Sequence, residues 1–357
     1  MGLVWASLPP CPAFGQLEGG HPVAPSGYQP TLQGPSPDAE RALSGLKLAE
    51  GLKASLFAAE PLLAHPVALH VDQRGRVFVC ETFRLGNGAT DNRRHMRWLD
   101  DDIAARTVED RVAMFRKWLS PEEFQSYANQ HDRLRVVIDD NGDGRADRSE
   151  VFADGFNEVA DGIGAGVLSH NGTVYFACIP KLWALRDQDG DDRADLRAPL
   201  HDGYGVHVAF IGHDLHGLTF GPDGKLYFSI GDRGLNVRTT EGATLAYPDA
   251  GAVLRCEPDG SELELFAVGL RNPQELAFNE AGDLFTGDTN ADGGDQARIL
   301  HVVEGMDSGW RIGYQYLDFP NVLGPWNNER LWKPAFPGQA AYVTPPLANH
   351  ANGPSGL

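Results

Sequence analysis

A two-strand pattern that recurs along most of the chain limits what this sequence can fold into. Each copy has an apolar run, a tight turn containing glycine, and a second run rich in β-branched and aromatic residues. Hydrophobic alternation on both sides of a glycine turn is the signal of a β-hairpin. The four copies are VALHVDQRGRVFVCET (67–82), AGVLSHNGTVYFACIP (165–180), HGLTFGPDGKLYFSIGD (216–232) and QELAFNEAGDLFTGDT (274–289).

The spacing of these copies predicts an all-β protein built as a β-propeller. The turn glycines Gly172, Gly224 and Gly282 recur at intervals of roughly 50 to 60 residues, which suits one propeller blade per copy. The turn glycine of the first copy, Gly75, lies almost twice that interval before Gly172. The first blade is therefore expected to carry an insertion.

The insertion, at about residues 96–130, is expected to be helical and to decorate the surface of the first blade. The apolar residues of the stretch 107–119 share one face of a helix at 3.6 residues per turn. They are Val108, Val112, Phe115 and Leu119. The sequence Ser120-Pro121-Glu122-Glu123 then has an N-cap, a first-turn proline and a capping-box glutamate, which predict a second short helix.

Composition narrows the class of protein. The 357 residues carry 30 Lys+Arg against 49 Asp+Glu, a net charge of −19. So negative a chain lacks the cationic face that a nucleic-acid partner requires. Apolar residues make up 42%, enough for a real core. No apolar stretch of about 18 residues occurs, so no transmembrane helix is expected.

The four cysteines do not indicate a disulfide framework. Cys80, Cys178 and Cys256 lie in or beside apolar runs, and Cys11 lies near the N-terminus. We interpret the first three as small buried side chains within strands. The chain contains neither CxxC nor CxxCH, which excludes covalent c-type haem in this chain.

Residues 1–45 are interpreted as an N-terminal tail and linker, and residues 46–357 as the propeller. The start, MGLVWASLPPCPAFG, is apolar but has no Lys or Arg for the positive region of an export signal. It can be the remnant of such a signal or a disordered tail. The stretch from about Gln16 to Pro37 is rich in Gly, Pro and Ser without periodicity, as linkers are.

One acidic loop has the complete pattern of a calcium site. DDNGDGRADRSE places Asp139, Asn141, Asp143, Gly144 and Glu150 at the positions of D-x-[DN]-x-[DN]-G-x5-E. This spacing wraps alternate oxygens around a hard cation, and the glycine permits the sharp turn. The remaining predicted ligands are the carbonyl of Arg145 and the carboxylate of Asp147, direct or through water. The alternative interpretation is a solvated acidic turn between two strands.

Two further acidic loops match less completely. The second, DQDGDDRAD, offers the carboxylates of Asp187, Asp189, Asp191 and Asp195. It has Asp192 where glycine is expected and Ala198 where the bidentate glutamate should stand. The third, DTNADGGD (288–295), can be a turn, a metal site or part of an active site, because spacing alone does not decide.

Polar side chains that could carry redox chemistry gather in the third and fourth copies. The stretch 212–237 contains His213, Asp214, His216, Asp232, Arg233 and Asn236, and Arg271 and Asn272 open the next copy. Loops that enter successive blades meet at one end of a propeller, so a base, a guanidinium and an amide would converge there. Two other roles stay open for the histidines: capping or core polar residues, and zinc ligation, which lacks a helical HxxxH and an obvious third ligand.

This arrangement resembles the soluble PQQ-dependent glucose and sorbosone dehydrogenases, which are six-bladed propellers. The resemblance rests on His213 before GPDGKLYFSIGD and on LRNPQELAF. It implies that His213 is the general base and that Arg271 and Asn272 hold the quinone, with Asp232 and Arg233 near cofactor and substrate. The stretch from HPVAL to GPSGL also resembles the N-terminal propeller of planctomycete-type membrane-bound dehydrogenases. Their matching runs include WLDDD, DGIGAGVL, GYGVH, GHDLHGL and DSGW.

The function implied is a PQQ- and calcium-dependent dehydrogenase domain. His213 would take the hydroxyl proton of a sugar or alcohol while hydride passes to the quinone, and Arg271 with a calcium ion would stabilise the developing charge. Asp214 is the nearest candidate to orient His213. A cytochrome c module outside this chain would accept the electrons, in the periplasm or cell envelope. The alternative is a non-catalytic, calcium-stabilised propeller that binds glycans or protein partners.

The chain is also expected to be a propeller truncated after about four blades. Only four hairpin signatures occur, while the resembled family closes with six. The final NHANGPSGL resembles the entrance of a fifth blade. An open propeller leaves one blade face exposed, so we expect association with itself or with a missing segment. Trp183, Tyr204 and Trp310 can line the pocket or pack in the core.

Overall fold

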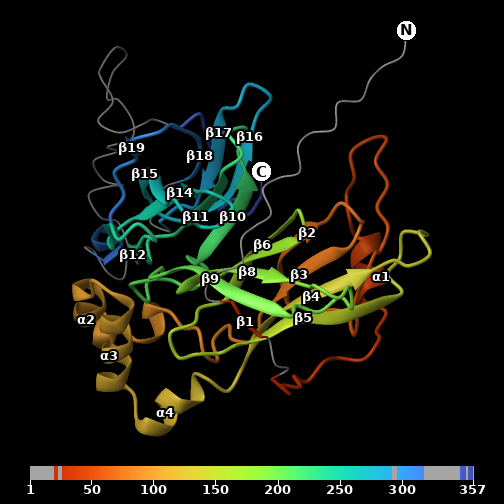
Figure 1. Ribbon diagram of the computed structural model, residues 1–357, viewed down its shortest axis with the longest axis horizontal. Helices are drawn as coiled ribbons and strands as arrows, with labels where there is room; N and C mark the ends of the chain where they lie inside the picture. The colour runs from red at the N-terminus through yellow and green to blue at the C-terminus, as the bar shows by residue number, and fades with distance from the viewer. Residues whose placement is uncertain (1–19, 23–25, 292–295, 317–345, 351–352, 357) are drawn as a thin grey trace.

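Four mainly antiparallel sheets, one from each hairpin copy, form the blades of the computed structural model, which describes residues 20–22, 26–291, 296–316, 346–350 and 353–356 (Figure 1). The chain is mostly β, and the sheets have a four-blade propeller arrangement, as the repeat predicted. Each blade begins with the strand that precedes the glycine turn and continues outward strand by strand.

The strands of the first two blades follow one another in chain order. The first blade consists of β2 (Pro66–Val71), β3 (Val77–Glu81), β4 (Asp132–Ile138) and β5 (Arg148–Phe156). The second consists of β6 (Gly164–His170), β7 (Thr173–Cys178), β8 (Lys181–Arg186) and β9 (Leu196–Asp202), with the short β1 (His21–Pro22) added to the edge of β9.

The third blade carries two additions, whereas the fourth is simpler. The third is β10 (Leu215–Phe220), β11 (Leu226–Ile230), β14 (Gly251–Cys256), β15 (Glu264–Leu270) and the parallel β19 (Met306–Asp307). A hairpin of β12 (Leu235–Arg238) and β13 (Thr244–Tyr247) is inserted between β11 and β14. The fourth is β16 (Pro273–Phe278), β17 (Leu284–Asp288), β18 (Ala297–Val302) and β20 (Ala348–His350).

Two backbone features repeat in all four inner hairpins. The turn glycines have left-handed φ values of 81° at Gly75, 78° at Gly172, 81° at Gly224 and 88° at Gly282, a conformation that glycine adopts without steric cost. Each inner strand, β2, β6, β10 and β16, also carries a register shift near its start, as a β-bulge produces. The repeat unit therefore has a bend at the point where the chain enters each blade.

Hydrophobic clusters join each blade to the next. Phe78 and Phe152 of the first blade pack with Phe176 of the second. Tyr175 and Leu182 of the second blade belong to a cluster with Phe228 of the third, and a further cluster joins Tyr227 to residues of β16 and β18. Cys80, Cys178 and Cys256 are buried and free within these clusters, as expected. The core is therefore a series of inter-blade layers.

The insertion of the first blade is helical, as predicted, but is more than a surface decoration. It contains the 3-10 turns η1 (Asn92–Arg94) and η2 (Met96–Trp98) and the helices α2 (Leu99–Ala104), α3 (Val108–Trp118) and α4 (Pro121–Ser126). Ser120 caps α4 with the predicted capping box. Buried Trp98 and Phe115 pack with Val208, and Asp102 accepts backbone hydrogen bonds from Val208 at 2.7 Å and Ala209 at 3.3 Å. The insertion thus supports the loop that enters the third blade.

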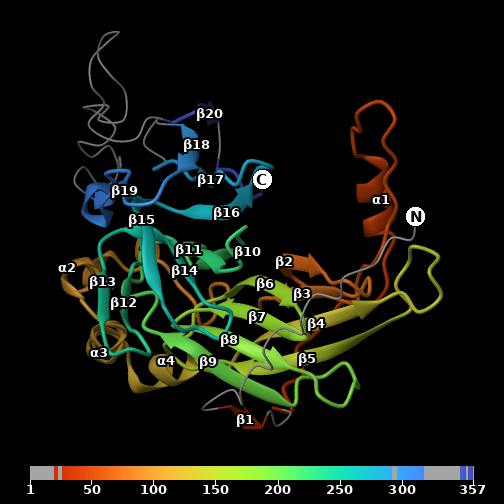
Figure 2. The same ribbon diagram turned by 45° about the horizontal axis from the view of Figure 1, so that its top comes forward.

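The segment interpreted as a linker also has local structure. Residues Asp38–Ser44 form helix α1, and His21–Pro22 pair with β9 (Figure 2). Within the described residues, no helix is long and apolar enough to cross a membrane. One face of the first blade is left uncovered by the part of the chain that the structure describes: Val67, Leu69 and Val71 of β2 are 44%, 63% and 54% exposed.

Candidate active site

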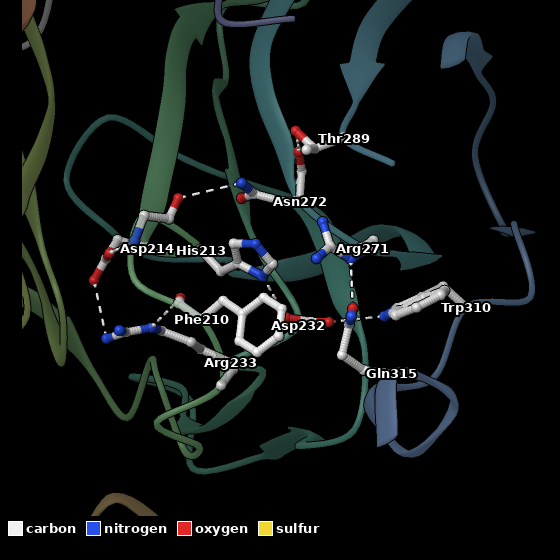
Figure 3. A network of polar contacts seen from close by, with 12 residues as sticks. Phe210, His213, Asp214, Asp232, Arg233, Arg271, Asn272, Thr289, Trp310 and Gln315 are labelled. Atoms are coloured by element: carbon white, nitrogen blue, oxygen red, sulfur yellow. Dashed lines mark hydrogen bonds and ion pairs between the residues drawn. The ribbon is translucent and has the colours of Figure 1, made fainter. Parts of the chain in front are cut away.

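The site forms where the loops that enter and leave the third blade meet the loop that enters the fourth. His213 precedes β10, and Asp232 follows β11, so the hairpin brings the two side chains opposite each other (Figure 3). The Nδ1 atom of His213 lies 2.7 Å from Oδ1 of Asp232, and both residues are buried. A carboxylate at Nδ1 makes that nitrogen the donor and leaves Nε2 as the acceptor.

Arg271 and Asn272 are held in place through hydrogen bonds to their backbone amides. The carboxylate of Asp288, at the end of β17, accepts hydrogen bonds from the amide N–H of Arg271 at 3.0 Å and of Asn272 at 2.7 Å. Arg298 forms an ion pair with the other oxygen of Asp288. The amide of Asp232 donates to the carbonyl of Arg271 at 2.7 Å, which ties the two loops together. The sequence left open whether the loop that begins at Asp288 is a metal site. In the structure, the Asp288 carboxylate fixes the backbone of the loop that enters the fourth blade.

The side chains of Arg271 and Asn272 have unused hydrogen-bonding capacity. Arg271 donates its Nε to Oε1 of Gln315 at 2.8 Å, and its guanidinium carbon lies 5.7 Å from the ring centroids of both Phe210 and Trp310. Asn272 donates Nδ2 to the carbonyl of Gly212 at 3.2 Å. The Oδ1 atom of Asn272 is buried and has no hydrogen-bond partner within the described residues. A buried acceptor without a donor is costly, so it marks a place for a ligand or water.

Burial, more than the surrounding charges, favours the neutral form of the His213 imidazole. Burial lowers the pKa of His213, and Arg271 and Arg233 lower it further, which outweighs the opposing effect of Asp232. For Asp232, burial raises the pKa, but His213, Arg271 and the hydrogen bond from Trp310 prevail and lower it. A neutral imidazole beside an ionised carboxylate is ready to accept a proton at Nε2.

His213, Arg271 and Asn272 line one cavity. The cavity has a volume of about 280 Å³. Its walls come from the loop Phe210–Gly212, from Gln274 and Thr289 of the fourth blade, and from Arg93 of the insertion. Gly353, Pro354 and Ser355, from the stretch that resembled a blade entrance, close one side. The third and fourth blades, the insertion of the first blade and the segment after β20 therefore contribute to a site that no single blade could form.

Asp214, which sequence proximity favoured as the orienter of His213, is not in that role. Its Oδ1 atom lies 3.3 Å from Nη1 of Arg233, and its Oδ2 accepts the amide of Gly212 at 3.2 Å. Arg233 also donates to the carbonyls of Phe210 and Thr90. His213 and Asp214 both lie just before β10, and the carboxylate of Asp214 points toward Arg233 and away from the imidazole of His213 (Figure 3). Asp232 takes the orienting role.

Asp232 and Arg233, expected near cofactor and substrate, do not line the cavity. Both are buried, and their polar atoms are occupied by protein partners. His216 is also occupied: its Nε2 lies 2.9 Å from the carbonyl of Gly212 and its Nδ1 3.4 Å from that of Ala165. His213 is therefore the histidine whose Nε2 lacks a hydrogen-bond partner among the described residues of the cavity.

Sequence reasoning missed Phe210 and Gln315 and left Trp310 undecided. Phe210 packs 5.9 Å from His213 between ring centroids, and Gln315 lies in the 3-10 turn η3 (Ile312–Tyr316). Trp310 donates Nε1 to Oδ2 of Asp232 at 2.8 Å. No spacing in the sequence links residues 310–315 to a hairpin at 213–232, because their proximity depends on β19 returning to the third blade.

The acidic loops lie away from this cavity and differ from each other. Within the described residues, Asp187, Asp189 and Asp195 are the group whose carboxylate oxygens lie within 4.8 Å of one another. In the loop with the complete pattern, Asp139 accepts the amides of Gly142 and Gly144. Glu150, the predicted bidentate ligand, instead forms an ion pair with Arg193 at 2.9 Å. Calcium binding stays a prediction for both loops. The carboxylates that converge belong to the second loop, whose sequence pattern is incomplete.

The other predicted ligands of these loops make local hydrogen bonds. Asn141 accepts the amide of Asp143, Asp143 accepts the amide of Arg145, and Asp147 accepts the amide of Asp140. In the second loop Asp191 accepts the amide of Arg193. Asp192, where glycine was expected, has a left-handed φ of 66° and pairs with Arg76 and Arg148. Of the third loop, residues 292–295 lie outside the described residues.

Comparison with known proteins places most of the chain in one family. The model of the family described as "Domain of unknown function (DUF7133)" matches residues 38–304. Quinoprotein glucose dehydrogenase B of Acinetobacter calcoaceticus is 29% identical over 142 residues, which cover 31% of this chain and 27% of that protein. The chain thus spans about a quarter of the length of this curated relative.

Solved structures are similar to this chain over a larger share of its length than this curated relative is. An oxidoreductase of Thermus thermophilus described as a glucose dehydrogenase is 19% identical, with a TM-score of 0.44, over 82% of this chain and 72% of that one. The PQQ-bound aldose sugar dehydrogenase of Streptomyces coelicolor is 16% identical, with a TM-score of 0.44, over 82% of this chain and 71% of that one.

Proposed function

This chain belongs to the DUF7133 family, and we propose that it is a quinoprotein dehydrogenase domain that oxidises a sugar or alcohol. The observation that carries the proposal is the cavity itself. A buried His213–Asp232 pair presents the acceptor Nε2 to the same cavity as the guanidinium of Arg271 and the unpartnered Oδ1 of Asn272. The local similarity to a quinoprotein glucose dehydrogenase supports the same interpretation.

His213 would act as the general base. Its Nε2 takes the proton of the substrate hydroxyl as the carbinol carbon gives up its hydride, so the C–OH becomes a carbonyl. Asp232 holds the ring in the tautomer that accepts at Nε2 and stabilises the imidazolium that forms. A positioned base of this kind contributes about 10²–10⁴-fold to the rate.

PQQ, when bound, would supply the two-electron acceptor for the hydride. The residues present fit such a group, because the cavity has donors and an acceptor that the protein leaves unused. The terminal nitrogens of Arg271 would hold a quinone oxygen or carboxylate, as a guanidinium fork does well. Asn272 Oδ1 would accept from a donor on the ligand. A calcium ion beside the quinone, a cytochrome c as electron acceptor and an exported location are parts of this proposal.

A titration of the protein with PQQ tests the proposal before any turnover is sought. The quench of Trp310 fluorescence should report binding, because this side chain lies beside Arg271. Arg271→Lys keeps the charge but loses the fork, so we expect the Kd to rise about tenfold or more. Arg74→Lys, in the exposed β2–β3 turn, is the matched control and should bind as the wild type does.

Dye reduction with PQQ, calcium and a panel of aldoses and alcohols then tests the chemistry. Turnover that depends on both PQQ and His213 is the expected result. Absence of saturable quinone binding by the wild type, or equal binding by Arg271→Lys, would contradict the proposal.

A further inference from the structure

Trp310 reaches the His213–Asp232 pair from a distant part of the chain. It follows the parallel strand β19 and is fixed by its own amide, which donates to the carbonyl of Gly269 at 2.9 Å. The indole is 1% exposed. Its Nε1 donates to Oδ2 of Asp232, while Oδ1 of the same carboxylate faces His213 (Figure 3). The carboxylate is thus held between two donors.

These contacts account for both oxygens of Asp232. Each oxygen has one side-chain donor, and the backbone amide of Asp232 is used by the carbonyl of Arg271. The orientation of the carboxylate therefore depends on both Trp310 and His213. The indole also lies beside Arg271, which Gln315 of the same segment fixes through its Nε.

We propose that Trp310 is a positioning residue that sets the base strength of His213 through Asp232. The inference rests on the proposed function in one respect only: the dehydrogenase reaction is what would use this base strength. An indole N–H on the carboxylate takes up part of its negative charge, which leaves less to stabilise an imidazolium at His213. Hydrogen bonds in such a chain influence one another because the surroundings have a low dielectric constant.

Loss of the indole N–H should therefore make His213 more basic. In Trp310→Phe the carboxylate keeps its charge but has a single donor, so the imidazolium is better stabilised and the pKa of His213 rises. The carboxylate also gains freedom to rotate, which loosens the orientation of the imidazole. In a competent enzyme we expect kcat to fall about tenfold.

The decisive measurement is an NMR titration of the His213 imidazole in the full chain without cofactor. This readout does not need turnover, so it tests the inference even if the protein proves not to be a dehydrogenase. Trp98→Phe is the matched control, because Trp98 is equally buried and donates its indole N–H to the neutral amide of Asn92 at 2.8 Å. We expect the pKa of His213 to rise in Trp310→Phe and to stay unchanged in Trp98→Phe. An unchanged pKa in Trp310→Phe, or the same rise in both variants, would overturn the inference.

A second measurement needs no variant, in case Trp310→Phe does not fold. In the wild type, the indole N–H resonance of Trp310 should move with pH through the midpoint at which His213 titrates, and that of Trp98 should not. A Trp310 resonance that stays constant while His213 titrates would show that the two side chains are uncoupled, which also overturns the inference.

Discussion

His213 and Asp232 face each other across the entrance of the third blade, with 2.7 Å between Nδ1 and Oδ1. Both side chains are buried, the pKa of the imidazole is lowered from its ordinary value by that burial, and its second nitrogen opens onto a cavity. A histidine oriented by a carboxylate in this way is a common arrangement for a general base. The first two predictions therefore concern substitutions of His213 and Asp232.

Replacement of His213 should abolish turnover and spare the cofactor. His213→Ala removes the proton acceptor, so we expect kcat to fall by about 10²–10⁴-fold, with the Kd for PQQ little changed because Arg271 and Asn272 remain. Steady-state kinetics and a PQQ titration check this. His216→Ala is the comparison, since both nitrogens of His216 contact backbone carbonyls. Loss of turnover from His216→Ala with an active His213→Ala would refute the assignment.

The pH profile should reflect the neutral imidazole. Only unprotonated His213 can accept a proton, so the rate should rise with pH and level off above the pKa of this residue. Because burial lowers that pKa, the midpoint should lie below the ordinary value for histidine, about 6.5. Asp232→Asn removes the charge that favours the imidazolium, which lowers the pKa again and moves the acid limb to lower pH while the maximal rate drops. A shift of the limb to higher pH in Asp232→Asn would contradict this account.

Gly231→Ala should damage both the site and the fold. A Cβ at this position would lie 2.8 Å from Cβ of His213 and 2.9 Å from Oδ1 of Asn272, closer than such atoms approach. We expect kcat/KM to fall about tenfold or more, through displaced side chains, and a loss of stability of about 1–3 kcal/mol. Thermal melts and kinetics separate the two effects. Gly45→Ala, where the nearest atom would be 3.4 Å away, should change neither.

Calcium should stabilise the protein through Asp187, Asp189 and Asp195. These carboxylates converge, and a cation between them would relieve their mutual repulsion. At a calcium concentration of about 100 times the Kd, the gain in unfolding free energy is about 2.7 kcal/mol, seen as a higher Tm than in chelator. Asp189→Asn should reduce the gain. Asp143→Asn tests the loop with the complete pattern; if only that variant loses the response, calcium binds there instead.

The uncovered face of β2 should promote association. Val67, Leu69 and Val71 present a row of exposed apolar side chains, and exposed apolar patches of this kind favour protein–protein contact. Leu69→Asp should therefore raise the fraction of monomer in sedimentation velocity at a given concentration. Leu347→Asp, at a similarly exposed leucine, is the control. Identical profiles for the wild type and Leu69→Asp would show that this face makes no contact in solution.

The fold was predictable from sequence because its signals are local. The four turn glycines and the alternation around them predict hairpins, and the structure has a blade at each. The capping box at Ser120 likewise specifies where α4 begins. Contacts made by segments far apart were not predictable. The segment Met306–Tyr316 returns to the third blade through only two residues of parallel strand, which leaves no pattern in the sequence.

The partner of His213 was missed for a reason that lies in the backbone. The turn of the third blade pairs Phe220 with Leu226, and this register, continued to the end of the hairpin, would place Arg233 opposite His213. A bulge between His216 and Thr219 shifts the pairing by one residue, so that Leu215 pairs with Ile230 and Asp232 comes opposite His213. A sequence pattern does not reveal such a shift, since the bulge depends on how the strand packs.

The same shift near the start of all four inner strands has a consequence for how new sites can arise in a protein of this kind. A repeat unit that already carries the bend presents its entrance residues toward the end of the propeller, whatever side chains they are. A blade can then gain or lose a proton acceptor, a cation or an amide by point substitution, with no change to its backbone. Each further copy of the unit adds entrance positions at which a functional side chain can be placed. A substitution at one such position leaves the backbone of the other blades unchanged.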